Sequence, residues 1–405
     1  MEKQKCPEIR FNGFDKEWME RSWRDTVEIS TNMVDPRNNE YGELFHIGPG
    51  NIKSFSGQFY DNILKVKDSN LISGKFYFKK GDIIYGKINP QLAKYVIAPF
   101  EGLASADAYV LNTKNGVVQN YLYAILQTND FYKYTVSVSS RTGMPKINRD
   151  ELNIYNYFSP SEAEQTLIGE FFQNLDQSIA LHEKKIAQTQ NFKKAMLEKM
   201  FPKQGDKCPE IRLKGFSGDW EKKKLENEVE FFSGLTYSPN DITDKNGTLV
   251  LRSSNVHDNQ IVTENNVYVD NEAINVQNVE VGDIIVVVRN GSRNLIGKHA
   301  VINEKMENTV IGAFMTGVKA SNPYFINALF DTNLFDVAVS RNLGATINQI
   351  TTGMFKEMEF SFPNEDEQIA IGQFFQKIDE TCLLLKQQLQ TVKNLKQALL
   401  EKMFV

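Results

Sequence analysis

Cysteine and long apolar runs are both scarce in this sequence, and each shortage excludes a class of protein. The three cysteines, Cys6, Cys208 and Cys382, are an odd set without a Cys-x-x-Cys pair, which argues against a disulfide framework or a structural zinc site. No stretch approaches the roughly 18 consecutive apolar residues of a membrane span. The opening Met-Glu-Lys-Gln-Lys-Cys is followed by no apolar segment, so it does not read as a signal peptide. We therefore expect a cytoplasmic protein.

Catalytic motifs are also missing. The sequence has no GxxxxGK[ST] phosphate loop, no GxSxG elbow and no HExxH pair, and its four histidines are scattered. Asn89-Pro90-Gln91-Leu92 and Asn322-Pro323-Tyr324-Phe325 resemble the Asn-Pro-Pro-aromatic motif with which adenine-N6 methyltransferases hold a flipped base. Both lack the second proline, and neither follows a glycine-rich turn for S-adenosylmethionine. We expect no catalytic residue, metal or cofactor in this chain.

The charge balance does not by itself suggest a nucleic-acid binder. The formal net charge is −5, whereas phosphate neutralisation usually requires an excess of lysine and arginine. If the chain contacts DNA, its basic residues must be concentrated locally, or partner subunits must supply much of the attraction.

The most informative feature is an internal duplication. A block reading Lys-Cys-Pro-Glu-Ile-Arg occupies residues 5–10 and returns at residues 207–212. A longer block opens with Glu164-Gln165 and closes with Leu-Glu-Lys-Met-Phe at residues 197–201, and it returns at residues 367–404. Between these blocks the halves have diverged, although Gly-Asp-Ile-Ile at 81–84 still matches 282–285. A chain that reads two different ligands would keep its scaffold and change its loops in this way.

Each half ends in a predicted helix of roughly 37 residues, or about 55 Å, with an apolar residue at alternating steps of three and four. This heptad seam is clear in the second copy, where only Lys396 interrupts it, and weaker in the first between His182 and Lys193. Neither helix could bury such a seam alone, so we expect the two to pack on each other; the alternative is burial in two separate cores. The seam positions are Ile168, Phe172, Leu175, Ile179, His182, Ile186, Thr189, Lys193, Met196 and Met200, and then Ile371, Phe375, Ile378, Cys382, Leu385, Leu389, Val392, Lys396, Leu399 and Met403.

The rest of each half is predicted to be an α+β domain of about 150 residues. Short β-branched runs at 83–85, 95–98, 284–288 and 299–302 are separated by Gly, Asn and Asp, which is typical of short strands and turns. Short helices are predicted at 119–128 and 323–329.

Polar loops at corresponding places in the two halves are the candidate binding elements. Arg reads guanine edges and Asn reads adenine edges, while Ser, Lys and main-chain amides suit phosphates. Each loop alone could be an ordinary solvated hairpin, but their recurrence in both halves favours binding. The candidate DNA-binding residues are Asn51, Lys87, Asn89, Gln91, Lys94, Arg141 and Lys146 in the first half, and Arg252, Ser253, Ser254, Asn255, Arg289, Asn290, Ser292, Arg293, Asn294, Lys298, Arg341 and Asn342 in the second.

Taken in order, these features resemble the specificity subunit of a type I restriction–modification system. The resemblance covers the whole chain and rests on the twin Glu-Gln helix starts, the Gly-Asp-Ile-Ile segments, the opening blocks with Trp18 and Trp220, and the Leu-Glu-Lys-Met-Phe closures. It implies two α/β target recognition domains, at 1–158 and 202–361, joined by two long antiparallel coiled-coil helices, at 159–201 and 362–405, with an internal pseudo-two-fold repeat.

In function, the resemblance implies that each recognition domain reads one half of a bipartite, asymmetric DNA site. The helix pair sets the spacer and docks two modification (methyltransferase) subunits. Those partners carry S-adenosylmethionine, while restriction subunits carry the ATP- and Mg-dependent translocase and nuclease. This chain is then a non-catalytic, cytoplasmic, double-stranded DNA-binding subunit.

Two other functions remain open from the residues alone. One is a coiled-coil scaffold with two protein- or glycan-binding domains, which would show no salt-dependent DNA binding. The other is a standalone methyltransferase, which would transfer methyl groups as the purified chain.

Overall fold

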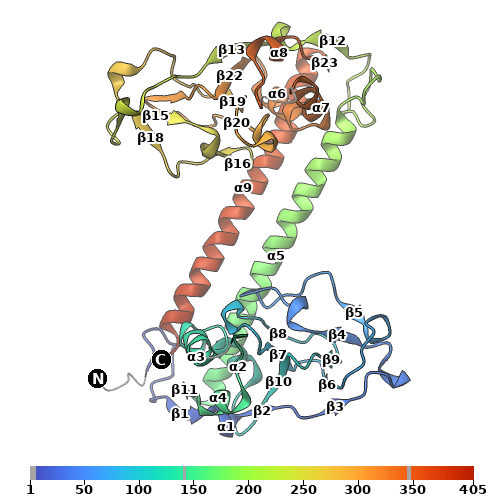
Figure 1. Ribbon diagram of the computed structural model, residues 1–405, viewed down its shortest axis with the longest axis vertical. Coiled ribbons are helices and arrows are strands. Elements are labelled where there is room, and N and C mark those ends of the chain that lie inside the picture. The colour runs from blue at the N-terminus through green and yellow to red at the C-terminus, as the bar shows by residue number, and fades with distance from the viewer. Residues whose placement is uncertain (1–5, 140–142, 344–347) are drawn as a thin grey trace. The chain divides into compact units, whose positions relative to one another are not determined.

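The computed structural model describes residues 6–139, 143–343 and 348–405 (Figure 1). Its contacts divide the chain into two compact units: unit 1 comprises residues 1–184 and 386–405, and unit 2 comprises residues 185–385. Each unit therefore combines one half of the duplicated chain with a segment of the other half's long helix. Across the described ranges, no helix is long and apolar enough to cross a membrane.

Unit 1 has three sheets among its described residues, with strand orders β1-β11, β2-β10-β7-β8 and β3-β6-β9-β4-β5. Its α-helices are α1 (Trp23–Thr26), α2 (Gln119–Ile125), α3 (Asn129–Ser139), α4 (Arg149–Ile154), the first part of α5 (Glu162–Met200) and the last part of α9 (Glu365–Lys402). Its strands are β1 (Met19–Ser22), β2 (Val27–Ile29), β3 (Met33–Val34), β4 (Phe45–Ile47), β5 (Leu64–Lys65), β6 (Lys75–Phe78), β7 (Ile83–Gly86), β8 (Tyr95–Ile97), β9 (Gly102–Ala104), β10 (Ala108–Thr113) and β11 (Asn156–Ser159).

Unit 2 repeats much of this order, with sheets β12-β23, β13-β22-β19-β20, β14-β18-β15-β21 and β16-β17 among its described residues. Its α-helices are the last part of α5, α6 (Pro323–Phe330), α7 (Asn333–Asn342), α8 (Thr352–Lys356) and the first part of α9 (Glu365–Lys402). Its strands are β12 (Glu221–Lys224), β13 (Val229–Ser233), β14 (Ile242–Thr243), β15 (Thr248–Leu251), β16 (Val256–His257), β17 (Gln260–Ile261), β18 (Val267–Val269), β19 (Ile284–Val287), β20 (His299–Val301), β21 (Thr309–Ile311), β22 (Met315–Ala320) and β23 (Glu359–Phe362).

The Gly-Asp-Ile-Ile segments explain why the central sheets correspond. Gly81 and Gly282 both adopt a φ of +94°, a left-handed conformation that suits glycine, and each leads directly into β7 or β19. Successive residues of these strands face opposite sides of the sheet, and both sides are buried. In β19, Ile284 joins the core beside the helices, whereas Ile285 joins a second core beneath the outer sheet. The predicted short strands are therefore confirmed.

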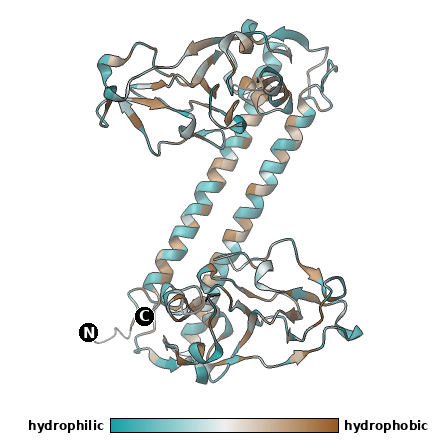
Figure 2. Ribbon diagram, viewed as in Figure 1, coloured by the Kyte–Doolittle hydropathy of each residue, from teal (hydrophilic) through white to brown (hydrophobic). Residues whose placement is uncertain are grey.

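The heptad prediction for α5 and α9 is also confirmed. The seam residues are buried or half-buried along both helices, while most of their neighbours are exposed; Figure 2 shows apolar residues recurring along each helix. In unit 1 Lys396 pairs with Asp176 and Lys393 pairs with Glu183. The order of these pairs runs in opposite directions along α5 and α9, so the two helices pack antiparallel there.

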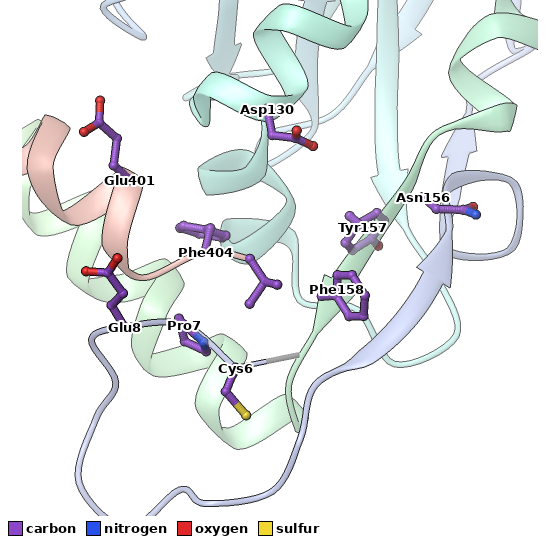
Figure 3. Close-up of a pocket in the computed structure, with 10 residues that line it drawn as sticks. Cys6, Pro7, Glu8, Asp130, Asn156, Tyr157, Phe158, Glu401 and Phe404 are labelled. Atoms are coloured by element: carbon purple, nitrogen blue, oxygen red, sulfur yellow. The ribbon is translucent and has the colours of Figure 1, made fainter. Parts of the chain in front are cut away.

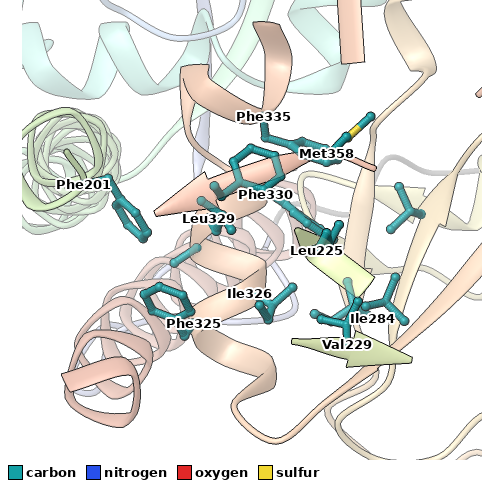
Figure 4. Packing of buried hydrophobic residues seen from close by; sticks show 14 of the residues in the cluster. Phe201, Leu225, Val229, Ile284, Phe325, Ile326, Leu329, Phe330, Phe335 and Met358 are labelled. Atoms are coloured by element: carbon teal, nitrogen blue, oxygen red, sulfur yellow. The ribbon is translucent and has the colours of Figure 1, made fainter. Parts of the chain in front are cut away.

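The repeated Leu-Glu-Lys-Met-Phe sequence ends each long helix, and its phenylalanine packs into a hydrophobic core. In unit 1 the Phe404 ring stacks on Tyr121 at 5.6 Å and meets Trp18 edge-on at 6.3 Å. In unit 2 the Phe201 ring lies 5.9 Å from Trp220 within a large buried cluster (Figure 4). The helices pair with each other within each unit, as expected, and their ends are also buried in the globular cores, as in the alternative.

The opening block of each half anchors the start of a helix. The Arg10 guanidinium donates to both carboxylate oxygens of the buried Glu164, at 2.6 and 2.8 Å. Arg212 makes the same two-point contact with the buried Glu367, at 2.8 and 2.6 Å. These glutamates belong to the Glu-Gln signature. In each copy, the opening block therefore supplies the arginine of an ion pair and the start of the long helix supplies its glutamate.

Two further repeated ion pairs occupy the helix seam. Lys396, which interrupts the apolar pattern, pairs with Asp176 in unit 1. Its counterpart Lys193 pairs in unit 2 with Asp379 at 2.5 Å and with Asp331 at 2.7 Å. The lysines are therefore seam residues that pair with half-buried aspartates on the facing elements.

Candidate nucleic-acid interface

Four segments of unit 2 meet where β19 ends. The main-chain amides of Val288 and Arg289 donate to the carbonyl of Phe314, at 3.0 and 3.2 Å. The Asn290 amide donates to the carbonyl of Asn348 at 3.3 Å, and the Asn290 side chain donates to the Ser253 hydroxyl at 3.0 Å. We call residues 252–255, 288–298, 312–314 and 348–350 the unit 2 loop cluster.

Unit 1 builds an equivalent cluster from equivalent main-chain bonds. The amide of Lys87 donates to the carbonyl of Asp107 at 3.0 Å, and the amide of Asn89 donates to Pro145 at 2.8 Å. The Lys94 ammonium donates to the carbonyl of Pro49 at 2.5 Å, which ties a further loop to the group. We call residues 48–58, 87–94, 105–107 and 143–147 the unit 1 loop cluster. Asn89 and Asn290 hold matching positions in the two frames.

Several predicted residues have exposed side chains on these clusters, although that of Gln91 donates to the Asn89 side-chain oxygen at 3.3 Å. In unit 2, Arg289, Ser292, Arg293 and Asn294 are exposed, and the Arg289 guanidinium lies over the Phe314 ring, 5.0 Å from its centroid. In unit 1, Gln91 and Lys146 are exposed, as is Ser254 in unit 2. Lys298 and Lys87 are half-buried at the bases of their loops.

Other predicted residues use their polar groups to build the loops. The Asn255 side chain is buried; its oxygen accepts from the Arg252 amide at 3.0 Å, and its Nδ2 donates to Val262. Asn51 does the same in unit 1, accepting from Gly48 at 2.8 Å. In this conformation the two asparagines shape a turn of main chain. The Arg252 guanidinium likewise donates to the carbonyl of Asn265.

Arg341 and Asn342 have their contacts outside the unit 2 loop cluster. The Arg341 guanidinium donates to Gln204, in the segment that follows α5, at 3.4 Å. Asn342 donates to the carbonyl of Ala338 within α7. Arg141 lies outside the described residues.

The unit 1 cluster concentrates positive charge despite the acidic chain. Burial, together with the charges of Lys146 and Arg149, lowers the pKa of Lys87, although Asp107 opposes that shift. Arg149 was not among the predicted residues; its guanidinium donates to the carbonyl of Ile29 at 2.8 Å. Lys53, Lys87, Lys94 and Lys146 lie within the cluster itself, against Asp107 as its acidic residue, so the cluster has a local excess of positive charge that the net charge of the chain does not reveal.

Two cavities lie among the described residues outside the loop clusters. In unit 1, a cavity of about 290 Å³ lies between the opening block, the end of α9 and β11 (Figure 3). Glu8, Asp130 and Glu401 line it, so its charge disfavours phosphate. In unit 2, a cavity of about 1720 Å³ is lined by residues at the end of α5 and in β23, the strand that corresponds to β11. Among the described residues, no group of three or more His, Cys, Asp or Glu side chains could hold a metal ion.

The structure thus presents two similarly framed polar loop clusters, each carried by one copy of a duplicated domain. A solved chain from a structure describing complex assembly and conformational transition of a type I restriction–modification system covers 95% of this chain and 97% of its own, with 15% identity and a TM-score of 0.50. The S subunit of the type I restriction–modification system of M. genitalium covers 99% of both chains, with 12% identity and a TM-score of 0.69. These two likenesses show a shared fold.

Sequence comparison identifies relatives as well. The type I restriction enzyme EcoDI specificity subunit of Escherichia coli is 33% identical over 150 residues, which are 36% of this chain and 32% of that protein, so the match spans about a third of either length. The family model of the type I restriction modification DNA specificity domain matches residues 15–191 and again residues 217–394. Because these two matches cover most of the sequence, the chain belongs to the type I restriction–modification DNA specificity family and contains its domain twice.

Proposed function

We propose that this chain is the specificity subunit of a type I restriction–modification complex, in which each unit reads one half of a bipartite, asymmetric DNA site. One observation carries the proposal: the two family matches coincide with two loop clusters that share a main-chain frame and differ in side chains. Ile88 in unit 1 and Arg289 in unit 2 each form an isolated antiparallel bridge at the equivalent position. The main-chain carbonyls of Asp107 and Phe314 accept equivalent amide hydrogen bonds. Two domains that recognise different half-sites would share a main-chain frame and differ in the side chains that it carries.

The conserved parts of the duplication then serve assembly. We propose that the α5–α9 pair sets the unread spacer and that the repeated surfaces dock two methyltransferase subunits, one for each copy. The ion pair of Arg10 with Glu164 is repeated by that of Arg212 with Glu367. This likeness supports docking of one methyltransferase subunit on each copy in the same way. A helix of 39 residues extends about 58 Å, which exceeds the ~34 Å of one turn of DNA.

Chemistry belongs to the partners under this proposal. The methyltransferase subunits bind S-adenosylmethionine and modify the DNA, and the restriction subunits bind ATP and Mg. This chain binds and positions DNA, without a cofactor of its own, in the cytoplasm. Its net charge of −5 is consistent with partners that supply part of the positive surface around the DNA.

Salt-dependent DNA binding tests the proposal. The chain in complex with its methyltransferase partner is titrated against duplex DNA between 50 and 200 mM salt. We expect log Kobs to fall with log salt, by about 0.9 for each neutralised phosphate. Arg293→Ala should reduce that slope or the affinity, whereas Lys305→Ala, at an exposed lysine outside the cluster, should not. Absence of DNA binding by the wild-type complex would instead favour a protein- or glycan-binding scaffold.

The spacer role has its own test. One heptad inserted after Ile186 and one after Leu389 would lengthen both helices between the two buried ion pairs, which keeps Lys396 with Asp176 and Lys193 with its partners. We expect the methylated motif to keep both half-sites and gain a longer spacer. An unchanged spacer would contradict the ruler role.

A further inference from the structure

Exposed phenylalanine is rare in this protein. The sequence has 27 phenylalanines, and all lie in the described ranges. Three are largely exposed: Phe55 at 56%, Phe192 at 48% and Phe314 at 54%. Phe192 lies on α5, where it meets Phe374 edge-on. The other two lie one in each loop cluster, although their positions are not equivalent in the duplication.

Phe314 is held at the centre of the unit 2 loop cluster. Its carbonyl accepts the amides of Val288 and Arg289, so its main chain is fixed to the loop that carries the candidate reading residues. Its ring remains in solvent beneath the Arg289 guanidinium, at 5.0 Å. The same loop cluster also carries the exposed side chains of Arg293 and Asn294. It therefore combines an exposed apolar ring with a guanidinium over it and with side chains that suit phosphates and base edges.

Phe55 has a comparable setting in unit 1. Its φ is +57°, which is uncommon for a residue other than glycine and is maintained only where the surroundings impose it. The amide of Phe55 donates to the carbonyl of Ala93 at 3.0 Å, and its ring meets Tyr132 edge-on at 5.4 Å. Tyr132 in turn donates to the carbonyl of Gln91. Phe55 therefore lies on the 48–58 segment, and its amide ties that segment to the 87–94 segment that carries Gln91.

We propose that Phe314 and Phe55 are base-contacting residues, each placing its ring against a base of the half-site that its unit reads. This inference rests on the proposed function. In duplex DNA an aromatic ring gains affinity by contact with the thymine methyl group in the major groove, and it can stack only on a base that has left the helix; neither contact depends on phosphate charge. An exposed ring whose main chain is fixed within a loop cluster is placed for that contact, and DNA would cover the apolar surface that the free protein leaves in water.

The test separates ring contact from charge and from folding. Cognate DNA binding is measured for the chain with its methyltransferase partner, comparing Phe314→Ala with Ile242→Ala, a matched exposed apolar residue on β14. We expect about a tenfold loss for Phe314→Ala with an unchanged salt slope, and a change under twofold for Ile242→Ala. The same loss should persist in an Arg289→Ala background if the ring contacts DNA directly. In unit 1, Phe55→Ala is compared with Ile72→Ala in the same way.

A crosslinking experiment avoids any dependence on stability. A benzophenone side chain at position 314 or 55 should crosslink to a base within one half-site, and one at position 242 should not. Wild-type affinity for Phe314→Ala, loss of its effect in the Arg289→Ala background, or absence of the crosslink would overturn the inference while leaving DNA binding intact. Failure of the wild-type complex to bind DNA would instead overturn the proposed function.

Discussion

Replacing Lys396 by methionine would break the ion pair that crosses the helix seam of unit 1. The side chain of Lys396 is 11% exposed and that of Asp176 is 19% exposed, so the substitution would leave a carboxylate in a site with little water. Burial raises the pKa of Asp176, and Lys396 opposes that rise. Removing one partner of a fully buried pair costs about 3–5 kcal/mol; because both groups keep some exposure, we expect about 2 kcal/mol here.

Hydrogen exchange measures this loss one unit at a time. A cost of about 2 kcal/mol corresponds to roughly 30-fold faster exchange through opening, and we expect it in residues 162–184 and 386–402. Unit 2, where Lys193 and Asp379 remain paired, is the internal control. Adding Asp176→Leu to Lys396→Met removes the stranded carboxylate as well, so we expect most of the protection to return.

The pH dependence gives a second check on the same variant. Without the ammonium, the folded-state pKa of Asp176 rises further above its unfolded value. The folded state then favours the protonated carboxyl, so the deficit should shrink as the pH falls towards that raised pKa. Wild-type exchange rates in Lys396→Met at neutral pH, or a double variant as damaged as the sum of its singles, would refute this account of the seam.

Three further substitutions test the packing of unit 2. Gly372→Ala should lower the unfolding temperature although alanine favours helices by about 1 kcal/mol, because its Cβ would lie 2.8 Å from a main-chain nitrogen of α6; an unchanged or higher temperature would contradict this. Arg212→Ala should cost about 3 kcal/mol in urea unfolding, since it strands the buried Glu367, and a neutral result would show that the pair does not anchor α9. Burial raises the pKa of Asp331, but His299 and a neighbouring lysine lower it to about 2. Its stabilisation is therefore present above the unfolded value and lost as the pH falls from about 4 to about 2, so the difference in urea midpoint between wild type and Asp331→Asn should shrink over that range.

Much of the architecture followed from sequence periodicity. The heptads of α5 and α9 and the strands β7 and β19 depend on local patterns, so they could be located from the residues alone. Contacts between distant segments could not. Lys396 interrupts an apolar pattern in sequence, and only the fold brings it to Asp176. Similarly, Arg10 reads as part of a conserved block until the structure places it on Glu164.

The binding residues were harder to predict because a loop asparagine has two uses. Asn255 is as suitable for an adenine edge as for capping a turn, and its burial shows that it caps. Conversely, Phe314 follows Gly312-Ala313 in a short turn before β22, and nothing in that pattern marks its ring as exposed. The sequence could not distinguish it from the many buried phenylalanines, since exposure depends on how four separate segments meet.

The methylated DNA motif tests the central claim most directly. Cells that carry this chain with its methyltransferase partner are compared by methylome sequencing with cells that carry Arg289→Ala and Arg293→Ala. The account predicts a bipartite adenine-methylated motif in the wild type, and in the variants a loss or relaxation confined to the half-site that unit 2 reads. An unchanged motif at normal efficiency, or altered specificity in both halves, would contradict the assignment of one half-site to each unit.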